Sequence, residues 1–507
     1  VLAAAGRGAA ALRQGELRSA IGSAARTLLF GLAAAAMLAA FVRIVSGRES
    51  SALATKELVL VGWLSGTLAF LNTWDLPIYL ALILAAALWG MLGDGLPAAV
   101  KRGLWTGAAA LVLALLTVVL WLPTFTSQAG GILPNLIFPT RLPQFLIMFV
   151  VLLLPAGLWL ALRTRGEVRT SWKTVVGITV ALPVALWGLS WVLAGLISVV
   201  APAQARASVL ALGASGIAEV AAAAVARRLD APGVALLLSL LLALAWLYLR
   251  QANRQRTEGG GNGIGAFVVL MIAAGAALVL IPEFFYLRDS FGSRMNTVFK
   301  FWYAAWLLWA VAAAYALAWP WERFGRSGKV LLVVAVFPIA LGLVYTTTAL
   351  WEKTSGFRVP GGPQLDGTAH LQQDDPADAS AIRWMRGSLA PGVIAEAVGG
   401  SYSQYARISA HTGFPTVLGW DFHEYQWRGD WTPQGSRRDD IARLYSTQDW
   451  AEAQSILDKY QVNYVVVGPL ERSTYAPLAT GKFDLHMDKL YDQDDVTIYG
   501  RRTQVGS

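Results

Sequence analysis

The sequence contains no cysteine and only four histidines. Disulfide bridges, thiolate metal sites and cysteine nucleophiles are therefore excluded within these residues. The histidines all lie in the last third of the chain, so no histidine-based metal site can form in the rest. Charged residues are also scarce, at 14% against about 25% in ordinary soluble domains.

Apolar residues are abundant instead. They make up 56% of 507 residues, with a mean hydropathy of +0.50, which excludes a soluble globular, disordered or fibrous protein. A bilayer core of about 30 Å needs roughly 20 apolar residues per helix. Ten runs come close: 27–45, 58–74, 77–93, 104–122, 143–162, 174–200, 232–250, 264–281, 301–319 and 330–350. We expect an α-helical polytopic membrane protein of about ten transmembrane helices, because lipid cannot satisfy loose backbone groups.

Charge divides the chain into two parts. The first 350 residues hold 26 basic and 12 acidic groups, a net of +14, whereas 351–507 hold 15 and 20, a net of −5. The basic groups of the first part occupy short loops between apolar runs, which indicates membrane topology and not a nucleic-acid partner. We predict an N-terminal remnant at 1–26, a transmembrane domain at 27–350 and a soluble α/β domain at 351–507. The sequence begins with Val and has no signal peptide, so we expect that the natural chain starts further upstream.

The loops alternate in basic content. Loops 94–103, 162–173, 250–263 and 320–329 carry twelve Lys and Arg, and the intervening loops carry seven. The positive-inside rule makes the first set cytoplasmic and places the C-terminal domain outside the plasma membrane. The Ala-rich segment 207–228 contains three charges, so we interpret it as an interfacial or re-entrant helix.

Two outer segments concentrate the chemistry of the membrane part. The hairpin Asn72-Thr73-Trp74-Asp75-Leu76-Pro77 contains a carboxylate, and the stretch 283–300 mixes charges with aromatic rings. Arg and Lys side chains there can bind a phosphate, and a nearby carboxylate can act as general base. The predicted roles are catalytic for Asp75, Glu283 and Asp289, phosphate-binding for Arg288, Arg294 and Lys300, and substrate-binding for Asn72, Trp74, Tyr286 and Asn296. The alternative is structural: Asp75 and Asn296 as helix caps and Lys300 as an interfacial anchor.

A third candidate lies in the tail, at 419–429. His423 and Glu424 have no second His four residues on, so the pattern fails for a zinc peptidase, and we expect no metal there. Carbohydrate or lipid-headgroup recognition is the functional interpretation, and docking of the aromatic rings onto the membrane part is the alternative. The predicted substrate-binding residues are Trp420, His423, Glu424, Trp427 and Arg428.

These motifs occur in an order that resembles the YYY polytopic membrane-protein family, a domain of unknown function. The stretch Arg294-Met295-Asn296-Thr297-Val298-Phe299-Lys300 is the most specific part of this likeness. The family is similar in layout to C-fold glycosyltransferases. The resemblance implies sugar transfer from a polyprenyl-phosphate donor to a glycan, lipid or protein acceptor, with a divalent cation (Mg or Mn) as a candidate cofactor. The Tyr-Tyr-Tyr motif and an upstream acidic loop would precede residue 1, so we expect part of the site to lie there.

Two other classes of function fit the same residues. One is a transporter or flippase of a polyprenyl lipid or small anion, and the other is a non-catalytic membrane scaffold. Transporter sites lie near the bilayer midplane. The charged residues here gather at one face, which favours the enzyme.

Overall fold

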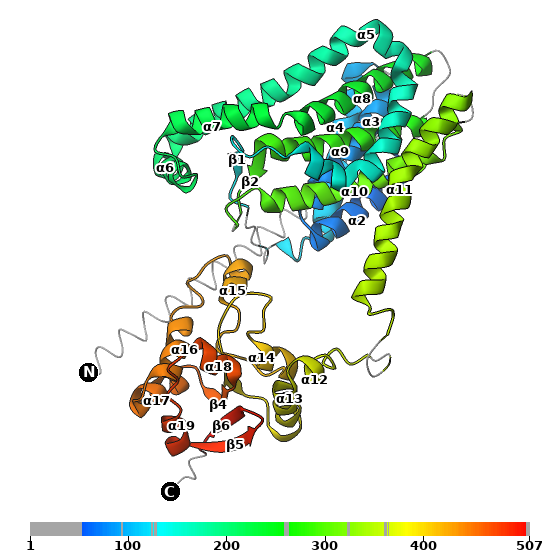
Figure 1. The fold of residues 1–507 in the computed structure, drawn as a ribbon. Helices are drawn as coiled ribbons and strands as arrows, with labels where there is room; N and C mark the ends of the chain where they lie inside the picture. The colour runs from blue at the N-terminus through cyan, green and yellow to red at the C-terminus, as the bar shows by residue number, and fades with distance from the viewer. Residues whose placement is uncertain are drawn as a thin grey trace. The chain divides into compact units, whose positions relative to one another are not determined.

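The computed structural model describes residues 53–92, 95–122, 125, 129–257, 263–289, 291–321, 325–358, 362 and 365–502. The chain forms two compact units, Val1–Lys353 (unit 1) and Thr354–Ser507 (unit 2). The predicted span 27–45, the predicted remnant 1–26 and most of the Gly-rich loop 259–265 lie outside the described residues. Figure 1 traces both units.

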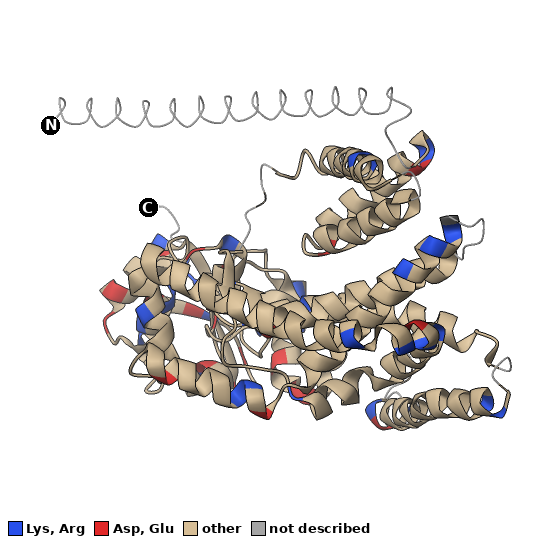
Figure 2. Cartoon of the chain, turned by 90° about the horizontal axis from the view of Figure 1, so that it is seen from above, with Lys and Arg blue, Asp and Glu red and all other residues tan. Residues whose placement is uncertain are grey.

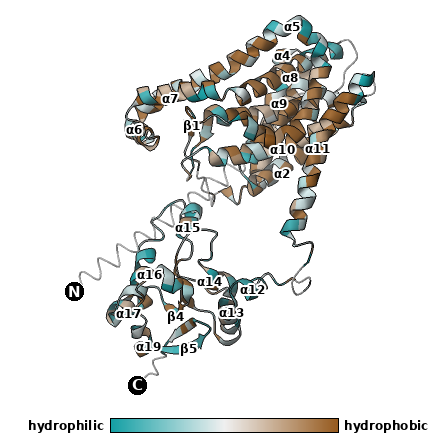
Figure 3. Cartoon of the chain, in the orientation of Figure 1, coloured by the Kyte–Doolittle hydropathy of each residue, from teal (hydrophilic) through white to brown (hydrophobic). Residues whose placement is uncertain are grey.

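The described part of unit 1 consists of helices and two short strands. Its elements are α2 (Thr55–Leu71), α3 (Asp75–Met91), α4 (Leu96–Thr117), β1 (Ile132–Pro134), α5 (Leu142–Val200), α6 (Pro202–Ala211), α7 (Ile217–Asp230), α8 (Gly233–Thr257), α9 (Gly263–Phe284), β2 (Phe285–Leu287), α10 (Met295–Leu317) and α11 (Gly325–Lys353). Six described helices are long and apolar enough to cross a membrane: α4, α5, α8, α9, α10 and α11. Hydrophobic colour covers these helices in Figure 3. The two helices of the predicted hairpin, α2 and α3, have 17 residues each.

The predicted loop at 162–173 is wrong. Residues 142–200 form α5, in which two helices meet at a kink at Ser171, the one residue inside the element with non-helical φ and ψ. Residues 162–173 contain one Gly and no Pro. Their charges therefore interrupt the apolar pattern without breaking the backbone hydrogen bonds of the helix. At about 1.5 Å per residue, each side of the kink at Ser171 is still long enough for a span.

The segment around 207–228 forms two helices, α6 and α7, separated by residues 212–216, which include two glycines. Neither helix is among those long enough to span a membrane. Strands β1 and β2 were not predicted. They pair antiparallel with Leu133 opposite Tyr286, and they join the segment before α5 to the end of α9.

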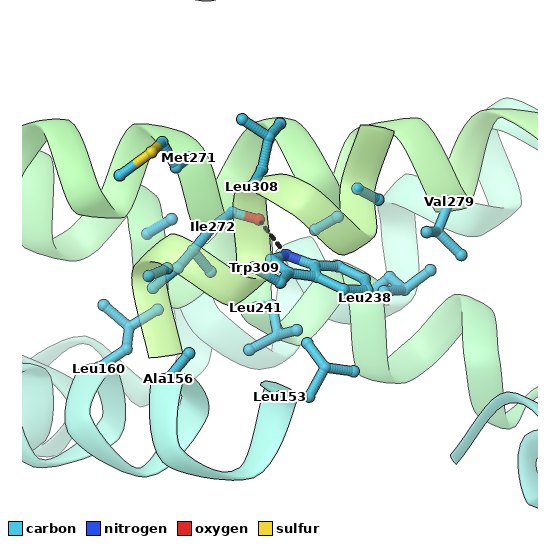
Figure 4. Packing of buried hydrophobic residues seen from close by; sticks show 14 of the residues in the cluster. Leu153, Ala156, Leu160, Leu238, Leu241, Met271, Ile272, Val279, Leu308 and Trp309 are labelled. Carbon is cyan, nitrogen blue, oxygen red and sulfur yellow. Dashed lines mark hydrogen bonds between the residues drawn. The ribbon is translucent and has the colours of Figure 1, made fainter. Parts of the chain in front are cut away.

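The core of unit 1 lies where α5, α8, α9 and α10 meet. Trp309 of α10 is fully buried there, and its indole Nε1 donates to the carbonyl oxygen of Ile272 on α9 at 3.1 Å (Figure 4). Gly275 allows this close approach, because a Cβ at that position would lie 2.4 Å from the Trp309 Nε1. Small residues thus let α9 and α10 pack tightly.

Figure 2 colours the charged residues on the ribbon and shows the long helices mostly in the tan of the other residues. At one end of the bundle, Arg256 of α8 donates to the carbonyl oxygen of Trp89 on α3 at 3.0 Å, and Arg163 of α5 lies 5.0 Å from the ring centroid of Trp319. Helix α9 runs from that end to Glu283, so Glu283 lies at the opposite end.

Unit 2 has an α/β architecture. Its sheet has the order β3-β4-β6-β5, with β3 parallel to β4 and the other pairs antiparallel. Its elements are α12 (Leu371–Asp374), α13 (Pro376–Ser388), β3 (Val393–Ala395), α14 (Arg407–Thr412), α15 (Asp421–Arg428), α16 (Arg437–Ser446), α17 (Trp450–Lys459), β4 (Val462–Val467), α18 (Pro469–Thr474), α19 (Gly481–His486), β5 (Met487–Gln493) and β6 (Val496–Arg501). Its interior contains the ion pairs of Arg407 with Asp378 and Glu471.

Candidate functional site

Glu283 is the centre of the charged cluster in unit 1. It lies one residue before the end of α9 and is 1% exposed. Its carboxylate accepts hydrogen bonds from the Thr140 backbone N at 2.8 Å, from the Thr140 hydroxyl and from Arg294 Nη1 at 2.9 Å. Arg228 Nη1 lies 3.9 Å from the other carboxylate oxygen. Both oxygens of this carboxylate accept hydrogen bonds from the protein, so Glu283 is poorly placed to take a proton from a substrate.

Backbone oxygens hold the two arginines in place. Arg294 also donates to the Pro282 carbonyl oxygen at 3.1 Å, and Arg228 donates to the carbonyl oxygens of Asn135 (2.8 Å) and Glu283. The Asn135 side-chain amide donates to the Pro282 and Glu283 carbonyl oxygens, both at 3.1 Å. We call Glu283, Arg228, Arg294, Thr140 and Asn135 the Glu283 network.

The Glu283 network carries excess positive charge. One carboxylate faces two guanidinium groups, whose side chains are 11% exposed at Arg228 and 20% at Arg294. Burial lowers the pKa of Arg228 to about 10, an effect that Glu283 partly opposes, so this group remains protonated at neutral pH. An anion at the exposed edges of the two guanidiniums would compensate the remaining charge.

The other predicted residues of the 283–300 stretch lie on β2, in the loop after it and in the first two turns of α10. Asp289 accepts from the Asn296 amide at 2.7 Å and from the Phe291 backbone N at 2.9 Å, so its carboxylate shapes the loop. Burial raises the pKa of Tyr286, which lies on β2. Arg288 is exposed, and Lys300 is half-buried in the second turn of α10.

The 72–77 hairpin lies beside the start of α10. The Trp74 ring packs edge-on against Phe301, with centroids 6.3 Å apart, which places Asp75 at the same end of unit 1 as the 283–300 stretch. Asn72 ends α2, and its carbonyl oxygen accepts from the Asp75 backbone N at 2.9 Å. Among the described residues, no hydrogen bond or ion pair engages the Asp75 carboxylate. That leaves this carboxylate available to a ligand.

The capping alternative does not match the described geometry. The N-cap of α3 is Trp74, and Asp75 is the first residue of the helix. No side-chain hydrogen bond caps the start of α3 among the described residues. The N-cap of α10 is Arg294, and the Asn296 amide is bonded to Asp289 instead.

No group of three or more metal-ligand side chains occurs within the described ranges. The Glu283 oxygens already accept from Thr140 and Arg294, and Asp289 is bonded within its loop. Asp75 is the predicted carboxylate for which no such bond is found among the described residues.

The predicted tail residues form a separate cluster in unit 2. Glu424 and Arg428 pair at 2.6 Å one turn apart on α15, and His423 Nε2 accepts from the Trp427 indole at 2.9 Å. Trp420 lies 5.5 Å from His423 by ring centroids.

Sequence reasoning missed Thr140, Asn135 and the partnership of Arg228 with Glu283. Thr140 and Asn135 are ordinary loop residues in the sequence, and Arg228 lies 55 positions from Glu283. The β1–β2 pairing brings the segment of Asn135 and Thr140 beside the end of α9, and Arg228 reaches both from α7. The signal that could have suggested it is the Arg227-Arg228 pair, which follows a run of Ala and Val residues in α7.

A protein-family model matches residues 26–309, more than half of the chain. The chain therefore belongs to the uncharacterized membrane protein family DUF2298, and it is an integral membrane protein. This confirms the resemblance to a polytopic family of unknown function. The matched region includes Asp75 and the 283–300 stretch and ends before unit 2. No curated protein matches the chain, and no solved structure matches it.

Proposed function

We propose that this protein is a membrane glycosyltransferase that uses a polyprenyl-phosphate-linked sugar donor. The observation that carries the proposal is the pair of arginines around Glu283, positive in sum, at the same end of the helices as Asp75. The Asp75 carboxylate has no hydrogen bond or ion pair among the described residues. Guanidinium forks suit a phosphate, and a free carboxylate suits a general base.

In this proposal Arg294 and Arg228 bind the donor phosphate, with Arg288 and Lys300 at the rim. Asp75 takes the proton of an acceptor hydroxyl, whose oxygen attacks the anomeric carbon of the donor. The bond from that carbon to the phosphate oxygen breaks, and polyprenyl phosphate leaves with the bonding electrons. Glu283 is a positioning residue here, since its carboxylate is already occupied by Thr140 and Arg294.

The remaining parts of the proposal concern placement. About ten membrane helices, a plasma-membrane location and an extracytoplasmic unit 2 follow from the apolar runs and the loop charges. A divalent cation, Mg or Mn, would bind at Asp75 together with the donor phosphate. The acceptor is a glycan, lipid or protein, and unit 2 recognises it through Trp420, His423, Glu424, Trp427 and Arg428.

The test is sugar transfer by the full-length protein, with a radiolabelled polyprenyl-phosphate sugar as donor. We expect Asp75→Asn and Arg294→Ala each to lower the rate at least about 100-fold, as loss of a general base or a charge clamp does. The matched control is Glu57→Gln, an exposed carboxylate at the other end of α2. Wild-type rates in both site variants would refute the assignment.

A transporter or flippase is the second candidate, favoured by the anion-binding chemistry alone. It predicts exchange of a polyprenyl phosphate across a liposome membrane without a covalent product. That result, with no sugar transfer, would replace the enzyme.

A further inference from the structure

Four aromatic rings of unit 2 form a surface next to one edge of the sheet. Tyr402 lies 5.4 Å from both Trp420 and His423 by ring centroids, and His423 lies 6.0 Å from Trp427. Tyr402 and Trp427 are each 74% exposed. We call Tyr402, Trp420, His423 and Trp427 the aromatic platform. Tyr402 was not among the predicted residues.

Internal hydrogen bonds fix the rings of the platform. The Trp420 indole donates to the Tyr405 carbonyl oxygen at 2.7 Å, and the Trp427 indole donates to His423 Nε2 at 2.9 Å. Both indole N–H groups are therefore used within unit 2. Tryptophans that anchor a protein at a bilayer surface instead direct their N–H groups to the wet side. The exposed rings of Tyr402 and Trp427 therefore offer apolar ring surface and not indole N–H donors to a ligand.

The position of the platform also fits a ligand site. The loop that contains Tyr402 follows β3, and a parallel bridge joins Gly399 to Trp420 beyond the end of that strand. Open α/β sheets bind ligands outside the carboxyl ends of their parallel strands. Tyr402 has φ of 57°, a left-handed conformation that is uncommon for a residue with a large side chain. Such strain is concentrated at functional sites.

Charge selects the chemical class of the ligand. Glu424 and Arg428, the ionic residues one turn apart on α15, neutralise each other at 2.6 Å. Rings with negative π faces attract the partly positive C–H groups of a pyranose. We infer that the aromatic platform binds a neutral saccharide ring. As the acceptor site of a transferase this inference rests on the proposed function, whereas saccharide binding itself can be tested separately.

The experiment uses the full-length protein in phosphatidylcholine nanodiscs, because sugar-based detergents would compete. Saturation-transfer NMR with neutral tetrasaccharides of glucose, mannose and galactose measures binding. We expect ring C–H signals from at least one of these probes. Tyr402→Ala and Trp427→Ala should each weaken binding at least about tenfold, and Trp427→Phe should retain most of it.

Trp450→Ala provides a matched control. Trp450 stacks on His486 with ring centroids 4.6 Å apart, a second Trp–His pair of the same unit, and Figure 1 shows its helix α17 well separated from α15. This variant should bind like the wild type. Absence of any saccharide signal from folded wild type would overturn the inference. Crosslinking of Trp427 to a diazirine phospholipid in place of saccharide binding would do so too, in favour of membrane docking.

The same variants separate this inference from the proposed function. Asp75→Asn should bind the tetrasaccharide normally and transfer no sugar. Saccharide binding by a wild type that transfers nothing would leave the platform in place and refute the transferase. Undiminished sugar transfer in Trp427→Ala, with no saccharide bound by the wild type, would refute the platform alone.

Discussion

Replacement of Glu283 by Gln tests how far one carboxylate holds its end of unit 1 together. The substitution keeps the shape of the side chain and removes its charge. The introduced amide oxygen would still accept from Thr140, but the amide nitrogen would face Arg294, which donates to the native carboxylate at 2.9 Å. Two guanidinium groups, whose side chains are only 11% and 20% exposed, would then lack their anion.

The expected cost is about 3–5 kcal/mol in the free energy of unfolding, the range for one partner removed from a buried ion pair. Unfolding can be followed by intrinsic tryptophan fluorescence as SDS is added to phosphatidylcholine-based micelles. The exposed carboxylate Glu57 supplies the control, since Glu57→Gln should change the free energy by less than about 0.5 kcal/mol.

A double-mutant cycle separates charge from shape. Arg294→Met in the Glu283→Gln background removes one uncompensated cation, so it should cost at least about 1.5 kcal/mol less than in the wild type. A cost of Glu283→Gln below about 1 kcal/mol, or additive effects in the cycle, would refute the view that Glu283 neutralises these arginines.

Three further predictions concern other sites. Asp75→Asn should leave the free energy of unfolding within about 0.5 kcal/mol of wild type in the same assay while sugar transfer is lost, because no described partner engages this carboxylate. Gly275→Ala should destabilise unit 1 by about 1–3 kcal/mol, because the new Cβ would lie 2.4 Å from Trp309 Nε1. The control is Gly177→Ala on α5, where a Cβ would meet nothing within 4 Å, so this substitution should not destabilise unit 1. Burial raises the pKa of Glu396 in the folded protein above its value in the unfolded chain. The contribution of this carboxyl group to the stability of the fold is therefore fully present at pH values below the unfolded pKa, and it is lost as the pH rises through the folded pKa. Glu396→Gln should flatten that dependence in thermal melts of the whole protein between about pH 4 and 8; an unchanged pH profile would contradict this.

Much of the secondary structure could be predicted from the sequence. The β-branched run Val462–Val467 predicts a strand from the sequence alone, and β4 begins and ends at those residues. The charged segment 162–173 misled the same reasoning, because charge breaks an apolar pattern without breaking a helix. Strand β5 was missed, since Met487–Gln493 alternates few apolar residues and depends on β6 for its pairing.

The candidate site was predictable only in part. Its chemistry could be predicted from the residue types of 283–300 and of the hairpin. Its geometry could not, because the partners of Glu283 come from three other segments that are distant in sequence or separated by a loop. Tertiary pairing engages both carboxylate oxygens of Glu283 with protein donors, whereas Asp75 has no hydrogen-bond or ion-pair partner among the described residues.

The Glu283 network also limits how the helices of unit 1 can move. The Glu283 carboxylate, near the end of α9, bonds or pairs with residues of three other segments. Thr140 precedes α5, Arg228 lies near the end of α7, and Arg294 precedes α10. These ends must shift as one body unless the ion pairs break. A carrier that opened to both sides would have to hinge elsewhere, for instance at the Ser171 kink of α5.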